Sequence, residues 1–127
     1  MAAAEPALTN MGQAAAGDLQ AWGDACERQP AVLRQFDGWG NRVDEVVYPD
    51  AWRQLAAVAA RTGLVGLPYE TETAGGFGAD TRLVQAALCY LFAPSTATYL
   101  CPVAMTDGAA RVLTDAGGVG KPRAVLA

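Results

Sequence analysis

The sequence predicts an all-α domain, and three observations lead to this prediction. Apolar residues recur at helical spacing in four stretches, residues 18–28, 51–61, 82–93 and 102–115. Proline or a capping aspartate stands at or near the start of each stretch, as is typical of helix beginnings. Alternating runs of β-branched and aromatic residues are scarce, so strand signal is weak. We therefore expect about four main helices.

The first predicted helix follows an alanine-rich segment with polar interruptions. Residues 1–16 are expected to form a flexible N-terminal arm. Asp18 is expected to cap the helix that follows. Leu19, Trp22 and Cys26 lie at i, i+3 and i+7, so they form one apolar face of that helix.

A turn-rich connection separates the first two helices. Residues 31–36 are expected to add a short helical turn after Pro30, and Val43, Val46 and Val47 to lie in an extended or irregular connection. Residues 37–42, DGWGNR, have turn chemistry, since glycine and asparagine tolerate positive φ. The charged residues here are expected to form ion pairs that fix the turn rather than a catalytic site: Arg34, Asp37, Arg42 and Asp44.

The second helix is expected to begin at Pro49-Asp50, with Asp50 accepting backbone N–H groups. Its apolar stripe consists of Trp52, Leu55, Ala56 and Ala59. Residues 68–80 are expected to form a long loop, and Asp80 or Thr81 to cap the third helix.

The third helix carries apolar residues almost all round, which is typical of a buried helix. Pro102 suits the first turn of the fourth helix, because its missing N–H costs nothing there. The stripe of the fourth helix is Val103, Thr106, Ala109, Ala110 and Leu113. Met105 and Cys101 are expected to pack as core residues, and residues 116–127 to form a flexible tail.

Composition excludes several classes of function. Only 17% of the residues are charged, below the 25% or so of average usage, which indicates either a surface covered by a partner or an alanine-rich bias in composition. The net charge is −4 and the nine basic residues are scattered, so nucleic acid and anionic membranes are poor partners. The beginning of the chain lacks the features of a signal peptide, and no apolar run could span a bilayer. We expect a cytoplasmic protein.

Chemistry-bearing motifs are few. Histidine is absent, which excludes Ser-His-Asp and Cys-His catalysis and histidine-ligated metals, and no metal site is expected. The three cysteines lack a pairing motif and fit free thiols in a reducing compartment. The string GGVGK at residues 117–121 is followed by Pro122, not Ser or Thr, and no strand precedes it. It is therefore interpreted as a helix terminator rather than a phosphate loop.

Two stretches carry a resemblance to a known family. They are PAVLRQFDGWGNRVDEVVYPDAWRQL, residues 30–55, and YLFAPSTATYLCPVAMTDGAARVL, residues 90–113. Together they resemble the AidB-like branch of the acyl-CoA dehydrogenase family, including a Cys-Pro-hydrophobic-x-Met-Thr helix start. Chains of that family have an N-terminal α domain, a middle β domain and a C-terminal α domain. The resemblance implies that residues 17–115 are the N-terminal helical domain.

The resemblance also implies a function. The family's flavin and catalytic base lie mainly in the other two domains, so no catalytic residue is carried over and FAD would be held by a partner. The last two helices of this domain line the acyl pocket in the family, although Pro94 and Ser95 depart from the expected pattern. The residues that would face the acyl chain or the flavin side are Leu100, Cys101, Met105 and Thr106.

Two functions follow as hypotheses. In the first, the chain is the small subunit of a heteromeric dehydrogenase, and a larger flavoprotein subunit supplies the β and C-terminal α domains. Its substrate would be an acyl thioester of CoA or of a carrier protein. In the second, the chain is a non-catalytic binding or regulatory module that pairs its apolar face with a second copy.

Overall fold

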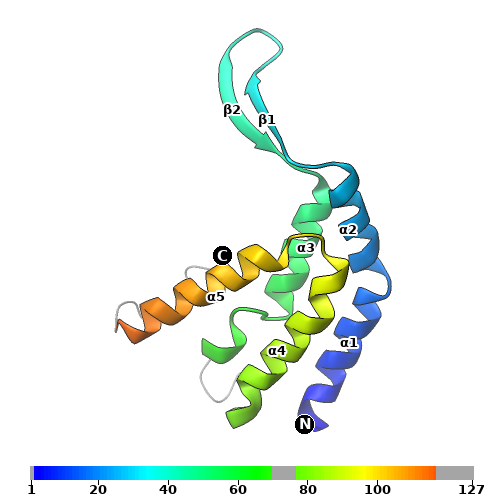
Figure 1. The fold of residues 1–127 in the computed structure, drawn as a ribbon, viewed down its shortest axis with the longest axis vertical. Helices are drawn as coiled ribbons and strands as arrows, with labels where there is room; N and C mark the ends of the chain where they lie inside the picture. The colour runs from blue at the N-terminus through cyan, green and yellow to red at the C-terminus, as the bar shows by residue number, and fades with distance from the viewer. Residues whose placement is uncertain (1, 70–76, 117–127) are drawn as a thin grey trace.

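A computed structural model describes residues 2–69 and 77–116 of the chain (Figure 1). It confirms the helical class and adds one small sheet. The α-helices are α1 (Glu5–Ala15), α2 (Asp18–Arg28), α3 (Asp50–Arg61), α4 (Thr81–Phe92) and α5 (Leu100–Asp115). The strands are β1 (Val32–Phe36) and β2 (Arg42–Val47), and short 3-10 turns lie at Ala2–Ala4, Leu67–Tyr69, Gly78–Asp80 and Ala93–Ser95.

Helices α1 to α4 form a bundle, and α5 runs across it. α1 packs on α4 and α2 packs on α3, while α5 runs at a large angle to α4 and extends away from the other helices (Figure 1). The core lies between them and contains fully buried Leu19, Leu55, Leu64, Leu88 and Phe92. Within the described residues no helix combines the length and apolar character that a membrane crossing requires.

The N-terminal segment differs from the expected flexible arm. Residues 5–15 form α1, and Met11 is buried against the core while Ala7, Leu8 and Ala14 pack at its edge. Alanine is the strongest helix former, and the apolar side chains of this segment gain burial on α4. Composition alone does not predict this packing, because alanine-rich sequence also occurs in segments without regular structure. The predicted tail is residues 116–127, and all of it except Ala116, which caps the end of α5, lies outside the described residues, as does most of the central loop.

The segment after α2 is a strand, so the expected helical turn at residues 31–36 is wrong. β1 pairs antiparallel with β2, in the register Val32 to Val47, Leu33 to Val46, Arg34 to Glu45 and Phe36 to Arg42. A bulge interrupts the pairing, and Asp44 there has φ +45°. Pairing with β2 makes residues 32–36 a strand rather than a helical turn, because valine and phenylalanine favour a strand once a second strand lies beside them.

The predicted helix starts are close, but the capping roles are not found. Gly17 and Pro49 occupy the caps of α2 and α3, so Asp18 and Asp50 are the first helical residues instead. Asp80 does precede α4 but makes no capping hydrogen bond. These acidic residues still lie where the helix dipole favours negative charge.

α4 is not buried all round, which corrects the expectation from its composition. Val84, Leu88 and Phe92 face the core, whereas Leu83 is 58% exposed and Tyr90 is 79% exposed. The exposed side is equally apolar, so sequence pattern alone could not separate the two faces. This leaves α4 with an apolar outer stripe, defined here as Leu83, Ala86 and Tyr90.

Candidate functional site

The four predicted pocket residues lie in the first half of α5, where two are half-buried and two are exposed. Leu100 and Thr106 are half-buried, and the Thr106 hydroxyl donates to the Pro102 carbonyl oxygen at 2.7 Å. Cys101 is exposed and Met105 is 71% exposed, so both expected core assignments are wrong. Residues four apart lie on the same side of a helix, which places Cys101 and Met105 together on the outside.

The outside of α5 forms a continuous uncharged face. We call it the α5 outer face; its exposed members are Cys101, Ala104, Met105, Gly108, Ala109 and Val112. Val112 on this face is 68% exposed. None of these side chains is charged, so apart from the Cys101 thiol the face offers van der Waals contact. Residues 101, 105, 108 and 112 have helical spacing in the sequence. Residues 103, 106 and 110 on the opposite, more buried side have it too, so the spacing does not say which side faces solvent.

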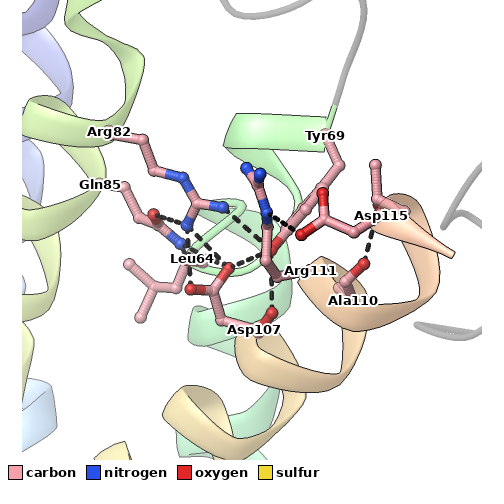
Figure 2. A network of polar contacts seen from close by, with 9 residues as sticks. Leu64, Tyr69, Arg82, Gln85, Asp107, Ala110, Arg111 and Asp115 are labelled. Atoms are coloured by element: carbon pink, nitrogen blue, oxygen red, sulfur yellow. Dashed lines mark hydrogen bonds and ion pairs between the residues drawn. The ribbon is translucent and has the colours of Figure 1, made fainter.

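A polar network fixes α5 to the bundle (Figure 2). The Arg82 guanidinium of α4 donates to both carboxylate oxygens of Asp107 on α5, at 2.9 and 3.0 Å. The Tyr69 hydroxyl donates to the Asp107 carboxylate at 2.9 Å and to its backbone carbonyl at 2.8 Å, while Arg82 donates to the Tyr69 oxygen at 3.0 Å. The guanidinium also stacks over the Tyr69 ring, 5.1 Å from its centroid.

Gln85 connects this network to the core. Its amide donates to the buried Leu64 carbonyl at 2.7 Å and to Asp107 at 3.3 Å, and it accepts from Arg82 at 2.9 Å. Burial raises the pKa of the Tyr69 hydroxyl above its ordinary range, with the Arg82 hydrogen bond opposing this change and Asp107 supporting it. The partners satisfy one another, so this network holds α5 in position. Sequence reasoning missed it because Tyr69, Arg82 and Asp107 are far apart in the chain.

The titratable groups that attach α5 to the bundle are engaged by one another. Asp107 is committed to Arg82 and Tyr69, and so is not free as a base. Burial raises the pKa of the Cys89 thiol, and the negative charge of Asp107 raises it further. Within the described residues, no group of three or more Cys, Asp or Glu side chains could hold a metal ion.

Thiol labelling tests the placement of Cys101. The thiolate is the reactive form, and burial raises the pKa of both Cys26 and Cys89. We expect one cysteine per chain, Cys101, to react in a fast phase with a thiol reagent, and the other two to react slowly. Cys101→Ser should remove the fast phase. A fast phase that persists in this variant would show that the α5 outer face is placed wrongly.

Comparison with known proteins decides the family. The family model for the adaptive response protein AidB N-terminal domain matches residues 1–122. The chain belongs to the AidB N-terminal domain family. In Caenorhabditis elegans, acyl-CoA dehydrogenase family member 11 is 32% identical over 114 residues, which is 90% of this chain and 18% of the relative. This AidB-type domain is thus an N-terminal helical domain of the acyl-CoA dehydrogenase family.

Solved structures share its fold. The apo form of Bd2924 is 43% identical with a TM-score of 0.79, over 87% of this chain and 21% of that one. Caenorhabditis elegans ACDH-11, in complex with C11-CoA, is 30% identical with a TM-score of 0.79, over 88% of this chain and 18% of that one. The AidB-type domain therefore spans about a fifth of the length of these relatives.

Proposed function

We propose that this AidB-type domain acts as the small subunit of a flavin-dependent acyl-thioester dehydrogenase. The α5 outer face closes the acyl pocket of a larger chain, which carries the β domain, the C-terminal helical domain, FAD and the catalytic base. The single observation that carries the proposal is the uncharged, exposed α5 outer face, with Met105 71% exposed. One relative, ACDH-11, has a structure with C11-CoA, so an acyl thioester is the substrate class that we assign.

The flavin fits the partner better than this chain. FAD carries a pyrophosphate, which proteins hold with basic side chains or backbone N–H groups. The α5 outer face has no basic side chain, and the nearest cations are committed, Arg82 to Asp107 and Arg111 to Asp115. When bound by the partner, FAD would accept the two electrons removed from the acyl chain. The residues of this domain would orient the chain and exclude water.

Burial of this surface supplies a driving force for association. A standard interface buries about 800 Å² on each partner, and apolar area contributes about 25 cal/mol per Å² before association costs. The α5 outer face and the α4 outer stripe together place Met105, Val112, Leu83 and Tyr90 in solvent, each more than half exposed. Large exposed apolar patches are typical of interaction sites.

Co-purification tests the proposal. We expect the tagged chain, expressed in its own cells, to bring down a larger protein with a yellow flavin absorbance. Met105→Lys should weaken this association at least about tenfold, because an unpaired ammonium would be buried and each 1.4 kcal/mol is tenfold. Gln20→Lys, at an exposed position of α2, is the matched control and should leave it unchanged. Recovery of the chain without flavin from every preparation would refute the proposal.

A second function keeps the same surface without catalysis. The α5 outer face carries no catalytic group, so it could equally pair with a second copy in a binding or regulatory module. In that case the isolated chain sediments as a flavin-free dimer, and Met105→Lys makes it monomeric.

A further inference from the structure

The β1–β2 hairpin extends from the bundle as an arm (Figure 1). Every residue of both strands is exposed, and the strands pair with each other. A lone two-stranded hairpin is marginally stable in water, and three or more strands or a packing surface are needed for stability. The arm nevertheless carries large exposed apolar side chains: Val32, Leu33, Phe36, Val43, Val46 and Val47. These features indicate that another surface covers the arm.

The tip of the arm presents one aromatic side chain on a hydrogen-bonded turn. Trp39 is 89% exposed. The Asp37 carboxylate accepts the Trp39 backbone N–H at 2.8 Å and the Asn41 backbone and side-chain N–H groups at 2.9 Å each. Gly40 completes the turn with φ +84°. The side-chain hydrogen bond from Asn41 lowers the pKa of Asp37, so the carboxylate that holds this turn stays ionised near neutral pH. Trp39 is therefore presented on an ordered turn.

The base of the arm contains a cleft of about 460 Å³. Small-molecule pockets have about 300–1,000 Å³, so this cleft admits an indole ring. Its walls are mostly apolar, and Glu27 and Gln29 are the lining residues whose side-chain oxygens can accept an indole N–H. Aromatic rings pack together on one side of the cleft. The Trp52 ring centroid lies 4.9 Å from that of Tyr99 and 6.3 Å from that of Tyr48. The lining residues are Cys26, Glu27, Gln29, Pro30, Ala31, Val46, Tyr48, Pro49, Trp52, Ala97 and Thr98.

Trp39 cannot enter the cleft of its own chain. The five residues of β1 separate the tip from the base, which is about 17 Å at about 3.3 Å per residue. The cleft of a second copy can be reached instead. A two-fold axis perpendicular to the arm places the arms of the two copies side by side and antiparallel. Each tip then lies at the other copy's base, as an isologous interface requires.

We propose that two copies of this chain exchange arms, with Trp39 of each copy seated in the cleft of the other. The arms also cover each other's apolar side chains and exposed strand edges. Charge does not oppose this pairing, since Arg34 pairs with Glu45 and Arg42 with Asp44 within each arm. A buried tryptophan contributes about 150–250 Å² toward the roughly 800 Å² per copy of a stable interface, and the arm side chains contribute the rest. This surface is separate from the α5 outer face.

Sedimentation of the purified chain tests the exchange. We expect a dimer in which Trp39→Ala weakens self-association at least tenfold, and Ala31→Trp, which fills the cleft from within, does the same. A mixture of the two variants gives the sharper result. The Trp39→Ala chain keeps an open cleft, and the Ala31→Trp chain keeps Trp39. The mixed dimer therefore has one intact tryptophan-in-cleft contact and should be tighter than either variant dimer.

Three outcomes would overturn the exchange: a monomeric wild-type chain, no gain on mixing, or dissociation by Met105→Lys in place of Trp39→Ala. Circular dichroism checks that both arm variants stay helical, which is expected because Trp39 and Ala31 are exposed. Flavin recovery separates this inference from the proposed function. A chain that captures the flavoprotein but sediments alone as a monomer refutes only the arm exchange.

Discussion

Gly23→Ala should destabilise the domain by about 3 kcal/mol, although alanine is ordinarily the better helix former by about 1 kcal/mol. Gly23 is buried in α2, where the helix meets the turn after α4. A Cβ at this position would lie 2.6 Å from the Ser95 carbonyl oxygen and 3.1 Å from its carbonyl carbon. Both atoms belong to the backbone, so relief requires α2 or the Ala93–Ser95 turn to move. Urea unfolding of the variant measures the loss.

Gly12→Ala is the matched control and should change stability in the opposite direction. Gly12 lies in α1, and nothing would approach a Cβ there within 4 Å. The substitution removes backbone freedom from the unfolded chain and should stabilise the domain by about 0.5–1 kcal/mol. Equal effects from the two substitutions would mean that α2 does not approach the turn as closely as described.

Asp107→Ala should have the second large effect, a loss of about 2 kcal/mol. The carboxylate accepts from Arg82, Tyr69 and Gln85, and hydrogen bonds to charged groups contribute about 1.5–3 kcal/mol. We expect the low end of this range because the Arg82 side chain is 45% exposed and water can replace part of what is lost. Hydrogen exchange should rise in α5 more than in α2, because this network attaches α5 to the bundle.

Asp115→Ala separates the network from a simple loss of charge. Asp115 pairs with Arg111 across one turn of α5, and both side chains are more than half exposed. Such i,i+4 pairs contribute about 0.3–0.5 kcal/mol, so this variant should unfold almost as the wild type does. If both aspartate variants lose the same stability, the network around Asp107 does not anchor α5.

Four of the five described α-helices, α2 to α5, could be predicted from the sequence because each carries a periodic apolar stripe with a start signal. Leu19 and Cys26 are buried as their spacing indicates, and Leu55 is fully buried. The hairpin was not predicted, although only residues 37–41 separate its strands, because neither strand alternates regularly between apolar and polar residues. The Arg82–Asp107 pair was missed for another reason, since it joins two helices across 25 positions.

The candidate site shows a different limit. The resemblance identified the first half of α5, but helical periodicity cannot say which of two apolar faces is buried. Val103 faces the core at 6% exposure, while Met105 two positions later is 71% exposed. Tertiary packing makes that choice, and here it leaves the predicted wall residues Cys101 and Met105 outside. An apolar helix with a solvent-exposed apolar face fits a domain that meets a further surface.

Protection of Cys101 tests most directly whether the α5 outer face closes a flavoprotein pocket. The chain is isolated with its flavin-bearing partner, and the labelling rate of Cys101 in this complex is compared with that of the free chain. We expect the fast phase to disappear in the complex and to return when the partner is removed. Labelling of Cys101 at the same rate in the flavin-bearing complex and in the free chain would contradict the account.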